Sequence, residues 1–179
     1  MIGKLSMVSR VKLTREANVI ERAHTIPHAT SYNVGLHKAN MLDMLVLLYP
    51  DAPRAAYKWI IQHDTPERFI GDIPSPAKWA GIVDLYSLGI VERDINRAVY
   101  QFEHLKLDGE WQQRLKGLDL LELYLWALDQ IMMGNRNLNT MRMRIERYVL
   151  ANDVFPEEQY SIFKEAQRNW NMMPDLGEY

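Results

Sequence analysis

Two histidines and two aspartates stand where helical patterns in the sequence favour apolar side chains. His37 falls in the first turn of one pattern, His63 and Asp64 end another, and Asp119 opens a leucine-rich one. Two imidazoles and two carboxylates are a ligand set suited to a divalent transition metal, and positions left open to water would make the site catalytic. Spacing alone does not bring the four together. Each also has a common structural explanation, as a hydrogen-bonded core histidine or an aspartate favoured by a helix dipole.

Further polar residues follow the His-Asp pair. Glu67 lies four residues after His63, so a continuing turn places its carboxylate on the same side, where it would act as general acid or base. Asp72 reads as a turn residue or as a group that holds a water or a leaving group. Lys78 lies in the predicted first turn of a helix, where free backbone N–H groups favour anions. The alternative for both Glu67 and Lys78 is an ordinary surface position.

Basic residues upstream are candidates for phosphate contacts. Arg22, in the segment "ERAHTIPH", is the best candidate because guanidinium binds phosphate through two parallel hydrogen bonds. His24 and His28 are lesser candidates for metal, base or phosphate contacts. Lys38, beside His37, would add another cation.

The segments that carry or adjoin these residues are all predicted to be helices. The predicted ranges are 34–49, 54–63, 77–88, 91–105, 115–133, 138–151 and 156–171. Pro66 ends or kinks the second of them, with Thr65 as a cap for a new turn, and Ser75 is expected to cap the next helix. "DGEWQQ" near residue 108 reads as a turn. The sequence predicts an all-α fold, a compact bundle of about seven or eight helices in one domain spanning residues 1–179.

Composition narrows the class of protein. Of the 179 residues, 47% are hydrophobic and 25% are charged, as in globular domains, and the net charge of −2 argues against general nucleic-acid binding. The absence of cysteine excludes disulfides, thiolate catalysis and cysteine-based zinc sites. No apolar run approaches the roughly 18 residues of a membrane span. We therefore expect no membrane partner and a cytoplasmic location, in the host cell if the source is viral.

The motifs resemble those of a known protein family. The pattern of a first His, a downstream His-Asp pair and a distant Asp resembles the HD-domain phosphohydrolases, and His37, His63, Asp64 and Asp119 match it. "HDTPERFIGDIPSPAK" and "LDLLELYLWALDQIMMGN" resemble motifs of the bacterial 5′-deoxynucleotidases of the YfbR type. "ERAHTIPH" before "VGLHKANM" is similar to the small HD proteins of bacteriophages, among which are the dATP triphosphohydrolases of the DatZ type. The match runs from about residue 15 to about residue 150.

The resemblance implies roles for individual residues. It implies metal ligation by His37, His63, Asp64 and Asp119, with Zn, Co or Mn as the metal and Mg as a candidate second ion. It implies catalytic roles for Glu67 and Asp72 and phosphate contacts for Arg22 and Lys78. One departure concerns the residue after the arginine, a Trp in the bacterial enzymes and Ala23 here. A sugar or base contact is then either missing or rebuilt by Ile26 or Trp79, so the substrate selectivity of the bacterial enzymes does not carry over to this chain.

The function expected from this resemblance is metal-dependent hydrolysis of a deoxynucleoside triphosphate. The preferred substrate is dATP, split to deoxyadenosine and triphosphate, which would shape the dNTP pool of a phage-infected cell. The alternative enzyme is a 5′-deoxynucleotidase that releases phosphate from dNMPs. A different class is a non-catalytic HD protein that senses a nucleotide or serves as a helical interaction module. The chain has five Trp and ten Met, and members of the family form homo-oligomers, so we expect a dimer or a hexamer.

Overall fold

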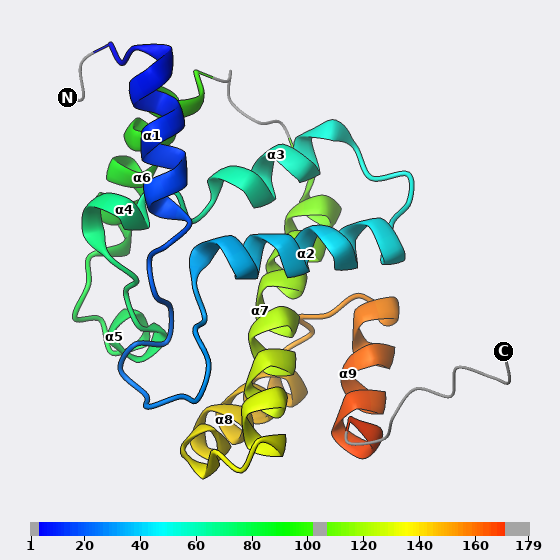
Figure 1. Ribbon diagram of the computed structural model, residues 1–179. Coiled ribbons are helices and arrows are strands. Elements are labelled where there is room, and N and C mark those ends of the chain that lie inside the picture. Colours follow the sequence, from blue (N-terminus) through cyan, green and yellow to red (C-terminus); the bar gives the residue numbers. More distant parts are fainter. Residues whose placement is uncertain (1–3, 102–106, 171–179) are drawn as a thin grey trace, which may run out of the picture. The chain divides into compact units, whose positions relative to one another are not determined.

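The computed structural model describes residues 4–101 and 107–170, and its regular structure is helical (Figure 1). The elements are α1 (Met7–Ala17), α2 (Val34–Leu48), α3 (Arg54–Gln62), α4 (Glu67–Ile70), α5 (Ser75–Trp79), α6 (Leu85–Tyr100), α7 (Gly109–Met132), the 3-10 helix η1 (Arg136–Leu138), α8 (Asn139–Ala151) and α9 (Glu157–Asn169). Within the described ranges, β-type pairing is limited to one antiparallel bridge between Glu21 and Asn33. The predicted all-α class is confirmed.

The chain divides into two compact units. The first comprises Met1–Pro27 and Ser31–Asp108, and the second comprises His28–Thr30 and Gly109–Tyr179. Each is described by itself below. The prediction of one domain over residues 1–179 stays a prediction.

The first unit is built from α1 to α6. Helix α2 packs against α3, and α1 packs against α4 and α6. Arg10 of α1 donates hydrogen bonds to the carbonyls of Val99 and Tyr100, where α6 ends, so a cation satisfies the free carbonyls of a helix C-terminus. The fully or almost fully buried apolar side chains of this unit are Ala17, Tyr32, Val34, Met41, Leu45, Tyr49, Ala56, Ile60, Ile95 and Val99.

The turn after α3 carries the His-Asp pair. Helix α3 ends at Gln62, and residues 63–66 continue as tight turns before α4, so the prediction that the helix stops ahead of Pro66 is confirmed. The predicted caps are wrong. Pro66, not Thr65, is the N-cap of α4, because the Thr65 hydroxyl is bound elsewhere, and Pro74 caps α5, in which Ser75 is the first residue.

The structure contradicts the bounds of the two helices predicted at 77–88 and 91–105, and has α5 and the single helix α6 in their place. The chain leaves the helical conformation after α5, and Gly81 has a positive φ of 67° there. Asp84 then caps α6 by accepting hydrogen bonds from two backbone N–H groups, and α6 runs without a break through Gly89. The acidic cap outweighed the helix-breaking tendency of a single glycine. Predicted residues 102–105 lie outside the described ranges.

In the second unit, α8, α9 and η1 pack against the long helix α7. The predicted turn near residue 108 is wrong beyond Asp108, because α7 already begins at Gly109, six residues before the predicted start. Glu110 in its first turn pairs with Arg114 one turn later, which favours the helix. The predicted end is confirmed. Gly134 adopts φ 87°, and the N–H groups of Gly134 and Asn135 bind the Ile131 and Gln130 carbonyls in a Schellman motif.

The segment His28–Thr30 is held on α7 by a buried glutamine. The side chain of Gln130 accepts a hydrogen bond from the Ala29 N–H at 2.7 Å and donates one to the Thr30 hydroxyl at 2.7 Å. The His28 ring packs edge-on against Trp126, with ring centroids 5.5 Å apart. His28 therefore serves packing in the second unit. None of the helices in the described ranges has both the length and the apolar character needed to cross a membrane.

Candidate functional site

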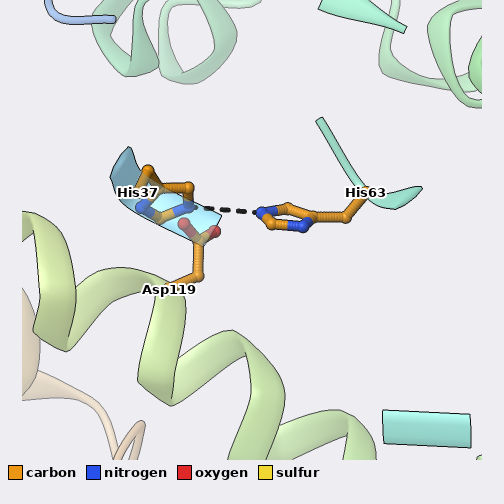
Figure 2. Close-up of side chains that lie close together, drawn as sticks. All are labelled: His37, His63 and Asp119. Carbon is orange, nitrogen blue, oxygen red and sulfur yellow. Dashed lines mark hydrogen bonds between the residues drawn. The ribbon is translucent and has the colours of Figure 1, made fainter. Parts of the chain in front are cut away.

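Three side-chain atoms that can bind a metal converge in the first unit. His37 comes from α2, His63 caps the end of α3, and Asp64 follows directly. The two Nε2 atoms of the histidines are 3.3 Å apart, with the rings turned toward one another (Figure 2). Asp64 Oδ2 lies 3.5 Å from Nε2 of His37 and 3.1 Å from Nε2 of His63. The three atoms form a compact triangle.

The spacing of this triangle fits a metal ion. Ligand atoms about 2.0–2.2 Å from one ion lie about 2.8–3.1 Å apart at adjacent positions of an octahedral shell and about 3.3–3.6 Å apart in a tetrahedral shell. The three observed separations, from 3.1 to 3.5 Å, fall close to these ranges. Two imidazoles and one carboxylate also match the nitrogen and oxygen donors that Zn, Co and Mn accept.

Both imidazoles are oriented by contacts on their far side. Nδ1 of His63 is 2.8 Å from the Ile60 carbonyl, which can only accept, so this nitrogen carries the proton and Nε2 presents a lone pair. The ring also stacks on Trp59, with centroids 4.6 Å apart and planes inclined by 6°. Nδ1 of the fully buried His37 lies 3.4 Å from the Tyr32 hydroxyl. Contacts of this kind fix the tautomer and direction of metal-binding histidines.

Arg22 lies between two carboxylates of the site. Its Nη1 forms an ion pair with Asp64 Oδ2 and lies 3.8 Å from Oε1 of Glu67. The three side chains are 12–14% exposed, so solvent screens these charges only in part. The guanidinium also lies over the ring of Tyr32, 5.8 Å from its centroid. An arginine is therefore held at the edge of the ligand triangle.

Glu67, at the start of α4, has the protonation behaviour of an acid or base at neutral pH. Burial raises the pKa of its carboxyl to about 7, against the opposing effect of the Arg22 charge, and the Asp72 carboxylate raises it further. Its Oε2 is buried and has no hydrogen-bond partner among the described residues. A buried carboxyl with an uncommitted oxygen and a pKa near 7 suits general acid–base chemistry.

Asp72 holds the segment that follows Arg22. Its Oδ2 accepts a hydrogen bond from the Ala23 N–H at 2.9 Å and lies 3.6 Å from Nδ1 of the half-exposed His24. Ala23 has a φ of 52°, a left-handed conformation that is uncommon for residues other than glycine. The carboxylate therefore stabilises an unfavourable backbone conformation beside Arg22. Sequence reasoning missed this contact, because no local signal marks a left-handed alanine.

Lys38 points into the first unit. Its side chain is buried, with 7% of the residue exposed, and Nζ donates to the Thr65 hydroxyl at 3.1 Å. Burial lowers the pKa of this lysine to about 8, partly offset by the Glu67 charge. We expected Lys38 to offer a cation to phosphate. In the structure its ammonium group instead forms an internal hydrogen bond that the sequence did not indicate.

The remaining predicted substrate residues lie on the loop after Arg22 and on α5. Lys78 of α5 is half-buried, and its charge lowers the pKa of Glu67, which places it within electrostatic reach of that carboxyl. Ile26 is half-buried in a turn that its N–H closes on the Ala23 carbonyl at 3.0 Å. Trp79 is the last residue of α5, and its side chain lies outside what the structure describes.

Asp119 belongs to the second unit and comes from α7 (Figure 2). The expectation that it opens its helix is wrong, because α7 begins at Gly109 and Asp119 lies well inside it. The favourable dipole of a helix start falls off within the first turn, so it does not account for this carboxylate. Its neighbour Leu118 and Leu121 are fully buried, so a polar residue stands in a largely apolar stretch.

Comparison with known proteins does not assign the chain to a family. No protein-family model matches the sequence, and no curated protein matches it. The resemblance to HD-domain phosphohydrolases rests on the motif residues themselves.

Proposed function

We propose that this protein is a metal-dependent phosphohydrolase that splits a deoxynucleoside triphosphate, preferably dATP, into deoxynucleoside and triphosphate. The observation that carries the proposal is the triangle of His37, His63 and Asp64, whose ligand atoms lie 3.1–3.5 Å apart. Beside it lie a carboxyl with a pKa near 7 and an arginine. A metal ligand set, an acid/base group and a cation are the parts that hydrolysis of a phosphate ester requires.

The ligand set proposed for the metal is His37, His63, Asp64 and Asp119. The first three are supported by their mutual distances, and Asp119 is supported by the motif and by its place inside α7. A bound Zn, Co or Mn ion would polarise a phosphoryl oxygen and lower the pKa of the attacking water. Mg is the candidate for a second ion.

The chain's own residues account for the proton and for the charge. Hydrolysis places a water oxygen on the α-phosphorus and breaks its bond to the 5′ oxygen, so one proton leaves the water and one reaches the deoxynucleoside. Glu67, whose pKa of about 7 lets it take up or release a proton near neutrality, is proposed as that acid/base. Arg22 and Lys78 are proposed to bind the phosphates, which carry more charge in a triphosphate than in a monophosphate.

Base selection is proposed for Ile26 and Trp79, in place of the Trp that follows the arginine in the bacterial enzymes. The preference for dATP rests on the resemblance of the segment around Arg22 to phage HD proteins. An enzyme of this kind would lower the dATP concentration in the cytoplasm of an infected host cell. We also propose a homo-oligomer, a dimer or a hexamer, and light scattering at the 21.0 kDa mass of one chain would contradict it.

Product analysis tests the proposal. The purified protein is incubated with each dNTP and dNMP in the presence of Mn, Co, Zn or Mg, and the products are separated by ion-exchange chromatography. We expect triphosphate and deoxyadenosine from dATP. Orthophosphate from dAMP with dATP untouched would replace the proposal with the 5′-deoxynucleotidase. Metal binding without hydrolysis of any substrate would favour a non-catalytic sensing or interaction role.

A further inference from the structure

A chain of hydrogen bonds runs through the first unit behind the ligand triangle. Lys38 Nζ donates to the Thr65 hydroxyl oxygen at 3.1 Å. The Thr65 and Tyr100 hydroxyl oxygens are 2.7 Å apart, and Tyr100 donates to the Ile61 carbonyl at 3.1 Å. The four residues come from α2, the turn after α3, the end of α6 and α3. We call this chain the Lys38–Thr65–Tyr100 relay.

The donor and acceptor chemistry gives the relay one direction. An ammonium group only donates, so the Thr65 oxygen accepts from Lys38. The Ile61 carbonyl only accepts, and the Tyr100 hydroxyl is the nearer donor, at 3.1 Å against 3.4 Å for Thr65, so we assign the Tyr100 proton to Ile61 and the Thr65 proton to the Tyr100 oxygen. Burial raises the pKa of Tyr100, which keeps this proton in place. Each hydroxyl both donates and accepts, and such chains strengthen one another.

Three of the four residues in the relay adjoin a residue of the ligand triangle or its support, and Tyr100 joins them from the end of α6. Lys38 follows His37 in α2, and Thr65 follows Asp64. Ile61 follows Ile60, whose carbonyl orients His63. The relay thus joins the three backbone segments that carry the three ligand atoms. Two of its groups face away from solvent, since Thr65 is fully buried and Lys38 is 7% exposed, whereas Tyr100 is half-buried.

We propose that the Lys38–Thr65–Tyr100 relay is a positioning device that sets the metal affinity of the His37, His63 and Asp64 triangle and does not contact substrate. This inference rests on the proposed function for the identity of the ligands. Lys38 and Thr65 are positioning residues for a metal site. The proposal gives Lys38 a positioning role in place of the phosphate contact that its charge and its place beside His37 led us to expect.

Thr65 is the member whose loss matters most. Valine has nearly the shape of threonine, so Thr65→Val keeps the packing and removes the hydroxyl alone. The buried Lys38 ammonium then loses its hydrogen-bond partner, and a buried charge without a partner is strongly unfavourable. We expect the lysine side chain to rearrange, and the first turn of α2, which carries His37, to shift with it. Tyr100→Phe should do less, because Thr65 Oγ1 also lies 3.4 Å from the Ile61 carbonyl and can donate there.

Metal titration of matched variants tests the inference. Binding of Mn and Co to the wild type, Thr65→Val, Thr65→Ser and Tyr100→Phe is measured by isothermal titration calorimetry, with a thermal melt of each. Thr14→Val, which removes an exposed hydroxyl bound to the Val11 carbonyl, is the control. Contacts behind metal ligands typically contribute about 10- to 100-fold in affinity. We expect a loss of that size for Thr65→Val, a smaller loss for Tyr100→Phe, and near wild-type affinity for Thr65→Ser and Thr14→Val.

Steady-state kinetics at saturating metal provides the second measurement. The KM for dATP should stay within about twofold of wild type in Thr65→Val, because a positioning residue for the metal does not touch substrate. Unchanged metal affinity in Thr65→Val would overturn the inference alone and leave the hydrolase proposal standing. A wild-type protein that binds neither metal would overturn both. If Thr65→Val does not fold, Tyr100→Phe decides, and wild-type affinity there overturns the inference.

Discussion

Substitution of Asp72 separates the catalytic role implied by the family resemblance from the positional role implied by the geometry. Asp72 Oδ2 accepts the Ala23 N–H at 2.9 Å, and Ala23 is the residue after Arg22. Asp72→Asn keeps an oxygen that can accept this hydrogen bond but cannot serve as a base. Asp72→Ala removes the acceptor. A positional role predicts a small effect for asparagine and a large one for alanine, whereas a catalytic role predicts large effects for both.

The expected magnitudes follow from the two contributions at Ala23. A hydrogen bond to a charged group contributes about 1.5–3 kcal/mol, and the left-handed conformation of an alanine costs about 1–2 kcal/mol. Without the Asp72 carboxylate, the bond that offsets this cost is gone, and the backbone at Ala23, with a φ of 52°, should relax and carry Arg22 with it. Since about 1.4 kcal/mol is tenfold, Asp72→Ala should raise the KM for dATP by about 10- to 100-fold. Asparagine replaces a charged acceptor by a neutral one, a loss of about 1 kcal/mol and less than tenfold.

The assay is steady-state hydrolysis of dATP with metal titration of each variant in parallel. Metal affinity should be unchanged, because Asp72 is not among the proposed ligands. Asp84→Ala is the matched control, since Asp84 is another aspartate that accepts backbone N–H groups, at the start of α6, and it should leave the KM unchanged. If Asp72→Asn slows turnover by about 100-fold or more, the size expected for a lost acid or base, the positional interpretation is refuted.

Three further predictions concern the two units. His63→Ala and Asp64→Ala should each abolish metal binding while the helical circular dichroism persists, and full metal content by elemental analysis would remove them from the ligand set. Glu67→Gln should keep the metal and slow turnover by about 100-fold or more, as for a missing acid or base, and wild-type turnover would exclude Glu67. Gly117→Ala should lower the free energy of unfolding in urea by about 1 kcal/mol, because displacing the buried Gln159 side chain, whose Oε1 would lie 2.0 Å from the new Cβ, costs about 2 kcal/mol and alanine gains about 1 kcal/mol over glycine inside a helix.

The sequence predicted α2, α3, α8 and α9 to within about two residues, but it divided α6, started α7 six residues late and missed α1. Helix α2 was predicted at 34–49 and found at Val34–Leu48, because an unbroken apolar pattern and the proline after it leave few alternatives. Helix α1 was missed. Its main anchors are Ser6, which caps it, and Arg10, which binds the end of α6 in a part of the chain about ninety residues away. A contact of that range leaves no periodic signal near α1.

The sequence identified residues of the candidate site, but it did not indicate which residues they contact. His37, His63 and Asp64 were chosen as polar residues in apolar patterns, and the structure brings their ligand atoms together. The contacts of Lys38 and Asp72 were not foreseen, because a lysine or an aspartate can turn to solvent or inward with the same local sequence. Which of the two occurs depends on a partner from a distant segment, Thr65 for Lys38 and Ala23 for Asp72.

The two unforeseen contacts act on different parts of the proposed site. The Lys38–Thr65–Tyr100 relay fixes the segments that carry the ligand atoms, whereas Asp72 fixes the backbone that carries Arg22. The two meet at the ion pair between Arg22 and Asp64, since Asp64 adjoins Thr65 and Arg22 adjoins Ala23. We therefore expect metal affinity to respond to the relay and the KM for dATP to respond to Asp72, although the two supports meet at this pair. Because the pair is largely shielded from water, with side chains 12% and 14% exposed, salt should screen the attraction between Arg22 and Asp64 only weakly.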